Sequence, residues 1–148
     1  MNVESFPEKG RHRMTLSHLI YSSRPFGFDQ ATLNGILSDA RRYNPKIDVT
    51  GALICRADLY LQMLEGEETA VETLYEQIRR DDRHLNIRRL VSGPIKERLF
   101  PGWAMRDDPA RSWMWTQDEV DAGAVERASP KEVMAVFVRL AAEPASEG

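Results

Sequence analysis

Two kinds of hydrophobic spacing alternate between residues 16 and 91, and their order leaves few folds open. Short apolar runs typical of strands cover residues 16–21, 49–55, 59–64 and about 87–91. Between them, two stretches repeat apolar residues at intervals of three and four, which is the spacing of one helix face. The apolar positions of these stretches are Leu33, Ile36, Leu37 and Ala40, and then Val71, Leu74, Tyr75 and Ile78. The pattern therefore predicts the order strand, helix, strand, strand, helix, strand.

This order is that of the ferredoxin-like βαββαβ fold, an α+β sheet with two helices on one face. We expect the first helix to start at an N-cap at Asp29, and a fifth strand to be added over residues 103–106. Right-handed crossovers would place the first and third strands side by side in the centre of the sheet. Capping-box sequences at residues 116–119 and 129–132 predict C-terminal helices, which we expect to cover the other face.

The 148 residues suit a single domain. We expect the polar residues 1–14 to be a disordered N-terminal lead and residues 15–108 to form the core. Residues 109–143 should form a C-terminal helical cap or output segment, and residues 144–148 a frayed tail. The Trp113–Trp115 cluster within the cap could pack on the sheet or serve as an exposed contact site, and we favour packing.

Composition argues against several classes of function. The formal net charge of −3, with both signs interspersed, gives no basic field for nucleic acid. We find neither an apolar run that could span a membrane nor a signal-peptide pattern, so we expect a cytoplasmic protein. The three histidines and the single cysteine, Cys55, show no metal-ligand spacing, and we interpret Cys55 as a buried packing residue. Because no catalytic motif is present, we do not expect an enzyme.

Polar side chains interrupt the expected apolar faces at three positions. Gln62 lies mid-strand on the face shared with Tyr60 and Leu64. Asn44 and Asp82 fall four residues beyond the last apolar residue of each helical stripe. An unpaired buried amide costs about 1–3 kcal/mol, so these groups need partners. Asn44 and Gln62 could bond to backbone, or they could converge between the helices on a planar ligand rich in donors and acceptors, and the pattern alone leaves both open.

A series of short motifs between residues 16 and 108 resembles the BLUF family of flavin-binding blue-light sensors in order and spacing. The motifs are Leu19-Ile20-Tyr21-Ser22-Ser23, Tyr43-Asn44, Val49-Thr50-Gly51-Ala52-Leu53, Leu61-Gln62-Met63-Leu64-Glu65-Gly66, Asp81-Asp82-Arg83-His84 and Phe100-Pro101-Gly102-Trp103-Ala104-Met105. No single motif is decisive, but their joint occurrence is specific. One departure is the turn after the second strand, where Ala57-Asp58 stands in place of the glycine that many members carry.

The resemblance implies a non-covalently bound FAD, with FMN or riboflavin as alternatives, whose ring lies between the two helices. Tyr21 then looks like the photochemical electron and proton donor. Gln62 looks like the amide that joins Tyr21 to the flavin and is left rotated or tautomerised by light. Asn44 resembles the residue that hydrogen-bonds the carbonyl and imide edge of the ring, and Arg83 resembles the arginine at its O2 side.

The same resemblance assigns a signal relay and further contacts. Trp103 and Met105 are similar to the pair on the last strand that exchanges position or hydrogen bonding with Gln62. The remaining residues expected to bind the flavin are Asp81, His84, Ile36, Ala40 and Leu53.

These residues together predict a blue-light photoreceptor whose interaction with a separate effector protein, or with its own oligomer, changes on illumination. We expect a separate effector because about 40 residues beyond the core leave no room for an effector domain. Two alternatives belong to other classes. A small flavin-dependent oxidoreductase would need a nicotinamide site, for which no motif is present, and a flavin-free ferredoxin-like interaction domain would not bind the cofactor at all.

Overall fold

A computed structural model describes residues 15–25 and 30–144 of the chain. The expected disordered lead, the expected N-cap at Asp29 and residues 145–148 of the expected frayed tail lie outside these residues. The described strands are β2 (Leu16–Pro25), β3 (Thr50–Arg56), β4 (Leu59–Glu67), β5 (His84–Pro94) and β6 (Arg106–Pro109). The described helices are α2 (Gln30–Tyr43), the 3-10 helix η2 (Asn44–Ile47), α3 (Glu68–Arg79), α4 (Gln117–Asp121), α5 (Ala124–Arg127) and α6 (Pro130–Ala141).

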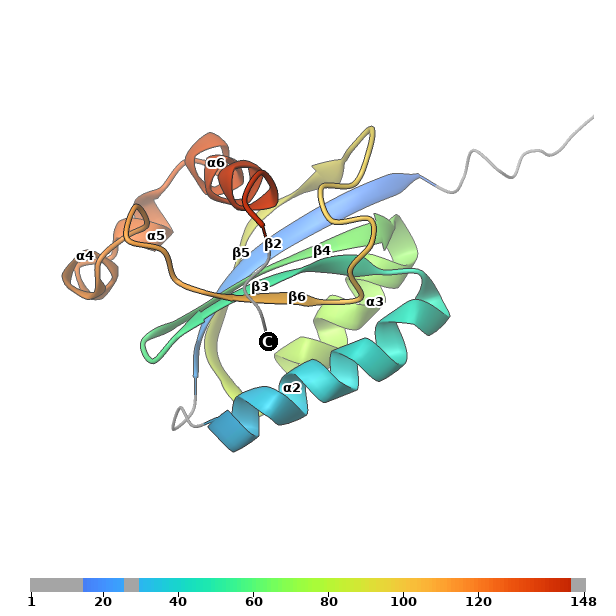
Figure 1. Cartoon of the computed structure of the whole chain (residues 1–148), viewed down its shortest axis with the longest axis horizontal. Helices are drawn as coiled ribbons and strands as arrows, with labels where there is room; N and C mark the ends of the chain where they lie inside the picture. Colours follow the sequence, from blue (N-terminus) through green and yellow to red (C-terminus); the bar gives the residue numbers. More distant parts are fainter. Residues whose placement is uncertain (1–14, 26–29, 145–148) are drawn as a thin grey trace, which may run out of the picture.

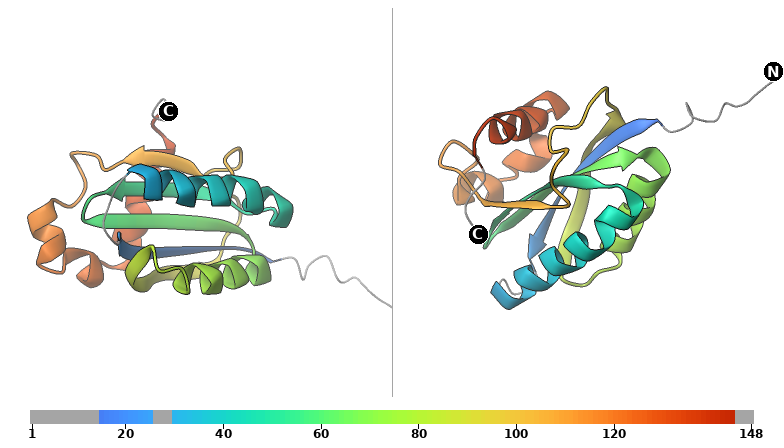
Figure 2. Two further views of the ribbon diagram at one scale, coloured as in Figure 1. Left: turned by 90° about the horizontal axis from the view of Figure 1, so that it is seen from below. Right: turned by 45° about the vertical axis from the view of Figure 1, so that its right-hand side comes forward.

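The described strands form one sheet in the order β5-β2-β4-β3-β6. The β2–β4, β2–β5 and β3–β4 pairs are antiparallel, and β6 pairs with β3 in parallel. The first and third predicted strands, β2 and β4, are therefore neighbours near the centre, as expected from right-handed crossovers. Helices α2 and α3 lie side by side across one face of the sheet, and α4, α5 and α6 lie on the other side (Figures 1 and 2). This arrangement confirms the predicted α+β fold.

Alternation along the strands divides the buried side chains into two clusters, one on each face of the sheet. Tyr60 and Leu64 of β4 belong to the cluster under α2 and α3, whereas Leu61 and Met63 belong to the opposite cluster. The stripe of α6 packs into this opposite cluster through Val133, Val136, Phe137 and Leu140. Gln62, which alternation places with Tyr60 and Leu64, is therefore aimed at the two helices.

The C-terminal cap follows local sequence signals. Thr116 and Ser129 each accept a hydrogen bond from the backbone three residues on, and the glutamate there returns one, so both predicted capping boxes are present. Met114 is buried, and Trp113 and Trp115 are partly buried against the same cluster as α6. The favoured packing interpretation of the Trp113–Trp115 cluster is thus confirmed.

Two boundaries differ from the prediction. The fifth strand begins at Arg106, not at Trp103, because residues 101–102 form a turn and regular pairing with β3 starts only where Ala52 meets Arg106. Asp82 does not continue the stripe of the second helix, because α3 ends at Arg79 and Asp82 lies in the exposed turn that follows. The expectation of an inward-facing Asp82 was therefore wrong.

The long segment between β5 and β6 is held by Glu65. Its side chain is buried, and its carboxylate accepts hydrogen bonds from the backbone N–H groups of Leu99 (2.5 Å) and Phe100 (3.0 Å) and from the hydroxyl of Thr50 (3.2 Å). Charge-assisted bonds to backbone N–H groups are among the stronger hydrogen bonds in proteins. The carboxylate thereby fixes the chain that leads into β6.

The thiol of Cys55 is partly buried and packs against the cluster under α2 and α3. Burial, followed by the nearby charges of Asp107 and Asp108, raises its pKa to about 11. A thiol with this pKa stays protonated at neutral pH and is a poor nucleophile, which agrees with a packing role.

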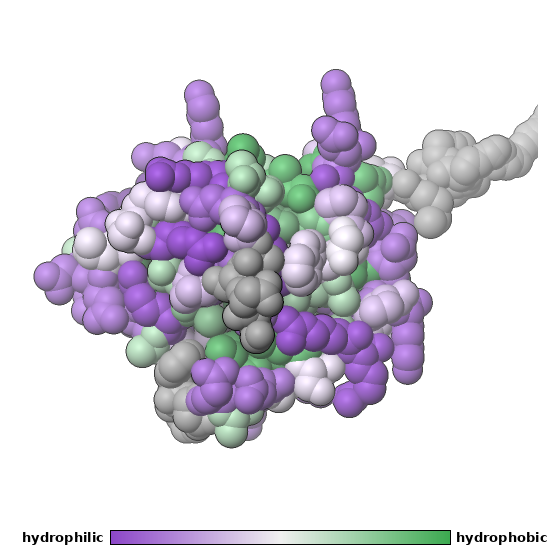
Figure 3. Space-filling model, in the orientation of Figure 1, coloured by the Kyte–Doolittle hydropathy of each residue, from purple (hydrophilic) through white to green (hydrophobic). Residues whose placement is uncertain are grey.

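The molecular surface in the orientation of Figure 1 is largely hydrophilic, with hydrophobic residues visible in places between the hydrophilic ones (Figure 3). Within the described ranges, none of the helices is both long and apolar enough to cross a bilayer. Nor do the described histidine, cysteine and carboxylate side chains gather into a cluster of three that could hold a metal ion.

Candidate functional site

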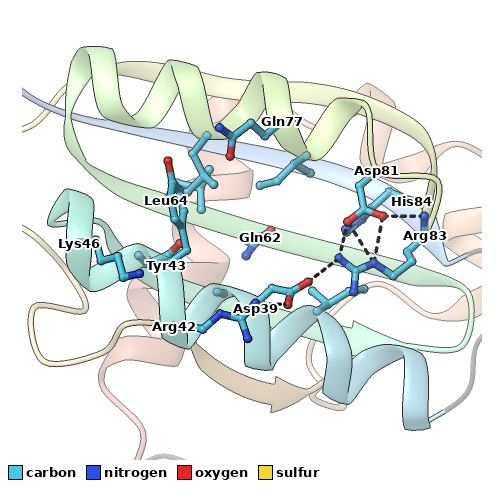
Figure 4. A pocket seen from close by; sticks show the side chains of 15 residues that line it. Asp39, Arg42, Tyr43, Lys46, Gln62, Leu64, Gln77, Asp81, Arg83 and His84 are labelled. Atoms are coloured by element: carbon cyan, nitrogen blue, oxygen red, sulfur yellow. Dashed lines mark hydrogen bonds and ion pairs between the residues drawn. The ribbon is translucent and has the colours of Figure 1, made fainter.

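A cavity of about 330 Å³ lies between α2 and α3, over the face of the sheet that carries Gln62 (Figure 4). This volume is at the lower end of the range typical of small-molecule sites, about 300–1,000 Å³. Its apolar lining is Ile36, Ala40, Leu64, Leu74 and Ile78, and its polar lining is Asp39, Arg42, Tyr43, Asn44, Lys46, Gln62, Gln77, Asp81, Arg83 and His84. A lining that combines apolar side chains with many hydrogen-bonding groups suits a flat ligand with polar edges.

Gln62 lies in the floor of the cavity and connects two other buried side chains. It stands opposite Tyr21 in the β2–β4 pair, and the Tyr21 hydroxyl donates a hydrogen bond to its Oε1. Its Nε2 in turn donates to Sδ of Met105 at 3.2 Å. Because one end of an amide accepts and the other donates, Gln62 can serve both neighbours only in this orientation.

Tyr21 is completely buried and does not line the cavity itself. Burial raises the pKa of its phenol well above the ordinary value of 10, and the nearby Tyr75 and Asp81 act in the same direction. The phenol is therefore neutral at any physiological pH. An electron can leave Tyr21 readily only if its proton also finds an acceptor, and the only hydrogen-bond acceptor found for it among the described residues is Gln62.

Asn44 has one satisfied end and one unsatisfied end. Its Nδ2 donates to the carbonyl of Ala104 at 3.1 Å, while its Oδ1 is buried and has no hydrogen-bond partner within the described part of the chain. The side chain borders the cavity, and the residue is 1% exposed. A buried carbonyl oxygen without a donor is costly, so this atom fits a ligand that brings an N–H group. The imide edge of a flavin is such a group.

Arg83 lies at one end of the cavity, where it joins the turn after α3 to α2. Its guanidinium bonds the carboxylate of Asp81 at 2.6–3.0 Å and that of Asp39 on α2 at 3.0 Å (Figure 4). Hydrogen bonding from Arg83 lowers the pKa of Asp81. Gly35 makes room for this bridge, since a Cβ there would lie 3.2 Å from Nη1 of Arg83. Arg83 thus offers a fixed cation at the cavity edge.

His84 borders the same end of the cavity and is buried. Its Nδ1 lies 2.8 Å from Oγ of Ser23, and its ring centroid lies 5.3 Å from that of Tyr60 and 6.0 Å from that of Tyr21. Burial lowers the pKa of His84 to about 4. The imidazole is therefore neutral near pH 7 and adds no charge beside Tyr21.

The two predicted relay residues are placed very differently. Met105 is 1% exposed and contacts Gln62, whereas Trp103 is 43% exposed and does not line the cavity. Leu53 is also absent from the lining; it stands opposite Gln62 in the β3–β4 pair and is buried in the core. Ile36 and Ala40 line the cavity as expected.

Several lining residues were not predicted, although helix periodicity contains them. On α2, Asp39 and Tyr43 follow Ile36 at intervals of three and seven. On α3, Gln77 follows Leu74 at an interval of three. These intervals keep residues on one helix face. The apolar members of each stripe were found, but their polar neighbours on the same face were overlooked.

The fold and the cavity define an α+β ligand-binding domain with a buried tyrosine–glutamine pair beside the ligand site. The sequence profile of BLUF, described as sensors of blue-light using FAD, matches residues 16–106. The chain therefore belongs to the BLUF family, whose cofactor is FAD. The unpartnered Oδ1 of Asn44 and the fixed cation of Arg83 fit such a group.

Relatives of known sequence and structure agree with this assignment. The chain is 34% identical over 92 residues to photoactivated adenylate cyclase subunit beta of Euglena longa. The matched region covers 62% of this chain and 10% of that protein. The chain thus spans about a tenth of the length of the curated relatives it matches first.

Two solved structures cover most of the chain. BlrB, a BLUF protein in its dark state, superimposes with a TM-score of 0.71 and 29% identity over 88% of this chain and 98% of its own. The photo-activated state of BlsA has a TM-score of 0.77 and 24% identity over 90% of this chain and 99% of its own, which supports the fold.

Proposed function

We propose that this protein is a cytoplasmic blue-light photoreceptor that binds FAD non-covalently between α2 and α3 and signals through a change in binding to another protein or to a second copy. The observation that carries the proposal is the buried chain of contacts from Tyr21 through Gln62 to Met105. It connects the floor of the cavity to the residue that precedes β6. A signal generated at the cofactor would therefore have a defined route out of the cavity.

Three side chains would hold the flavin ring. Asn44 would accept a hydrogen bond at its unpartnered Oδ1, Arg83 would place its guanidinium at the O2 side of the ring, and Gln62 would contact the ring from the floor. Apolar contacts from Ile36, Leu74 and other lining residues would exclude water from both sides. The dinucleotide end would extend beyond this cavity, whose volume of about 330 Å³ is small for a whole FAD.

The bound flavin absorbs blue light and supplies the excited-state oxidant. Tyr21 would give up an electron, and its phenol proton would move along the existing hydrogen bond to Oε1 of Gln62. When electron and proton return to Tyr21, the amide of Gln62 would remain reversed. Nε2 would then face Tyr21, and Sδ of Met105 would lose the hydrogen bond that it accepts from Nε2 in the present arrangement.

The output would pass through β6 to the C-terminal cap. Arg106 follows Met105 directly and points to the other face, where it bonds Asp108 (2.8 Å) and the backbone carbonyl of Glu143 (3.0 Å), just after α6. Arg111 joins Asp108 to the Glu143 carboxylate. A shift of β6 would thus disturb the contacts that hold the C-terminal end of α6. The altered cap would then present a different surface to its partner.

The direct test is the light-minus-dark absorption spectrum of the protein purified with FAD. A photoreceptor of this kind should shift its flavin absorption to the red under blue light and recover in darkness. Tyr21→Phe should keep the yellow colour but lose the shift. Tyr75→Phe is the matched control, because its ring lies 5.6 Å from that of Tyr21 but does not bond Gln62, and it should keep the shift.

The same preparation separates the other classes of function. A protein that stays colourless after FAD is added would refute the proposal and favour a flavin-free interaction domain. Rapid flavin-dependent oxidation of NADH would favour an oxidoreductase. An unchanged photocycle in Tyr21→Phe would reject the role of Tyr21 while leaving flavin binding in place.

A further inference from the structure

The strand β6 is held from the cavity side by an arginine that does not line the cavity. Arg41, in the last turn of α2, donates from Nε (3.3 Å) and Nη2 (3.1 Å) to the backbone carbonyl of Met105. Its Nη2 also bonds Oδ1 of Asp107 at 2.7 Å. We propose that Arg41 is a positioning residue that keeps Met105 against Gln62 and thereby sets the lifetime of the light-induced state. This inference rests on the proposed photoreceptor function.

The geometry constrains the strand at the position that matters. A guanidinium presents its N–H groups in a rigid planar fork, so a carbonyl bonded by two of them is fixed in direction as well as distance. The carbonyl that Arg41 grips belongs to Met105 itself, whose Sδ meets Gln62 at 3.2 Å. Asp107 lies two residues further on, where alternation returns the side chain to the same face. Arg41 therefore fixes two successive positions of this face.

The strand needs such a restraint because its backbone pairs with only one neighbour and its other anchors lie on the cap side. β6 is four residues long, lies at the edge of the sheet and pairs with β3 alone. Edge strands with one ladder are the least restrained strands of a sheet, and short ones exchange and shift most easily. Asn44 adds a bond to the carbonyl of Ala104, but Asn44 also borders the cofactor cavity. Arg41 is separate from the cavity lining, so its removal leaves the flavin contacts intact.

The ion pair and the carbonyl bonds make unequal contributions. Arg41 and Asp107 have side chains that are 46% and 39% exposed, and an ion pair this exposed to water stabilises little. The carbonyl of Met105 belongs to a residue that is 1% exposed, so its bonds are better shielded. Removing the guanidinium should therefore matter more than removing the carboxylate of Asp107.

The decisive variant is Arg41→Gln, and its matched control is Arg79→Gln. Arg79 occupies the last turn of α3, as Arg41 does in α2, and pairs with Glu76 without contacting β6. Both variants lose one positive charge at a helix C-terminus. Arg41→Lys keeps the charge and the bond to Asp107 but not the fork, and Asp107→Asn keeps the fork.

Two measurements on the full chain with FAD test the role. In darkness, amide hydrogen exchange over residues 104–109 should be faster by about five-fold or more in Arg41→Gln, the size expected for losing hydrogen bonds to a charged donor. After illumination, dark recovery should be slower by about five-fold or more, because Met105 must return to a position that nothing now holds. Arg79→Gln should change neither measurement by more than about two-fold, and Arg41→Lys and Asp107→Asn should lie between.

The outcomes separate this inference from the function on which it rests. Faster exchange with slower recovery supports it. Exchange and recovery that both stay within about two-fold of wild type in Arg41→Gln overturn it, and so does a change in only one of them. If Arg41→Gln does not fold, an unchanged photocycle in both Arg41→Lys and Asp107→Asn overturns the role. A wild-type protein without a red shift refutes the photoreceptor function itself, whereas a normal shift with unchanged recovery in the variant refutes only the role of Arg41.

Discussion

The unpartnered Oδ1 of Asn44 gives the sharpest test of the cofactor site. We consider Asn44→Leu, because leucine has the same number of side-chain heavy atoms and a similar branched shape but carries no polar group. In the protein without flavin, the change removes one hydrogen bond, from Nδ2 to Ala104, and also removes one unsatisfied buried acceptor. Each effect is about 1 kcal/mol and they oppose each other, so the free energy of unfolding should change by less than about 1 kcal/mol.

When flavin is bound, the substitution should instead lower the binding affinity. If Oδ1 accepts a hydrogen bond from the ring, the variant loses that bond and leaves the N–H group of the ligand buried without a partner. The cost is about 1–3 kcal/mol, which corresponds to a weakening of about 5- to 150-fold in Kd. The assay is a fluorescence titration of the apoprotein with FAD in the dark, together with urea unfolding of the same sample without FAD.

Asn34→Leu is the matched control, because Asn34 lies on α2 but is exposed and bonds only the side chain of Gln30 among the described residues. It should leave Kd within about two-fold. The reasoning is refuted if Asn44→Leu also binds FAD within about two-fold of wild type. It is equally refuted if affinity and stability without flavin fall together, because Asn44 would then be a structural residue only.

Two further predictions concern stability. The pKa of His84 is lowered to about 4, below the unfolded value of 6.5, so the unfolded chain binds more protons between these values and the free energy of unfolding should fall by about 2 kcal/mol from pH 7 to pH 5. Urea unfolding should show that His84→Gln lacks this part of the pH dependence while keeping the part due to His18, whose pKa is also lowered, and an identical pH profile would contradict the assignment. Asp108→Asn should cost about 3–5 kcal/mol, because the buried guanidinium of Arg106 loses its carboxylate. The exposed Asp121→Asn should cost under about 0.5 kcal/mol in the same thermal unfolding assay, and equal effects of the two changes would argue against a buried ion pair.

The elements that the sequence predicted correctly are those specified by local spacing. Apolar intervals of three and four placed α2, α3 and α6, and capping boxes placed the start of α4 and α6 within one residue. Two-residue alternation was enough to aim Gln62 at the helices. Asn44 faces inward as predicted, although Pro45 turns the chain there from an α-helix into the 3-10 helix η2.

The errors arose where a non-local contact decides the local structure. The start of β6 depends on where the chain meets β3, and the motif containing Trp103 and Met105 carries no local signal for that meeting. Whether Met105 or Trp103 contacts Gln62 likewise depends on the path between Glu65 and β6, since both side chains are apolar and two residues apart. The family resemblance placed Leu53 in the flavin site, but this residue stands beside Gln62 on the neighbouring strand β3 and is buried in the core without lining the cavity.

The position of β6 explains how a signal can cross a sheet that otherwise separates the cavity from the cap. Central strands such as β4 are bonded on both sides, so their displacement would break two ladders at once. β6 breaks only one. Because successive side chains point to opposite faces, any shift of this strand moves Met105 on the cavity side and Arg106 on the cap side together. Arg41 holds the strand from the cavity side, and the hydrogen bond from Arg106 to the backbone carbonyl of Glu143 ties it to the cap. The lifetime of the signal should therefore depend on the contacts of Arg41, and its transmission should depend on the contact between Arg106 and Glu143.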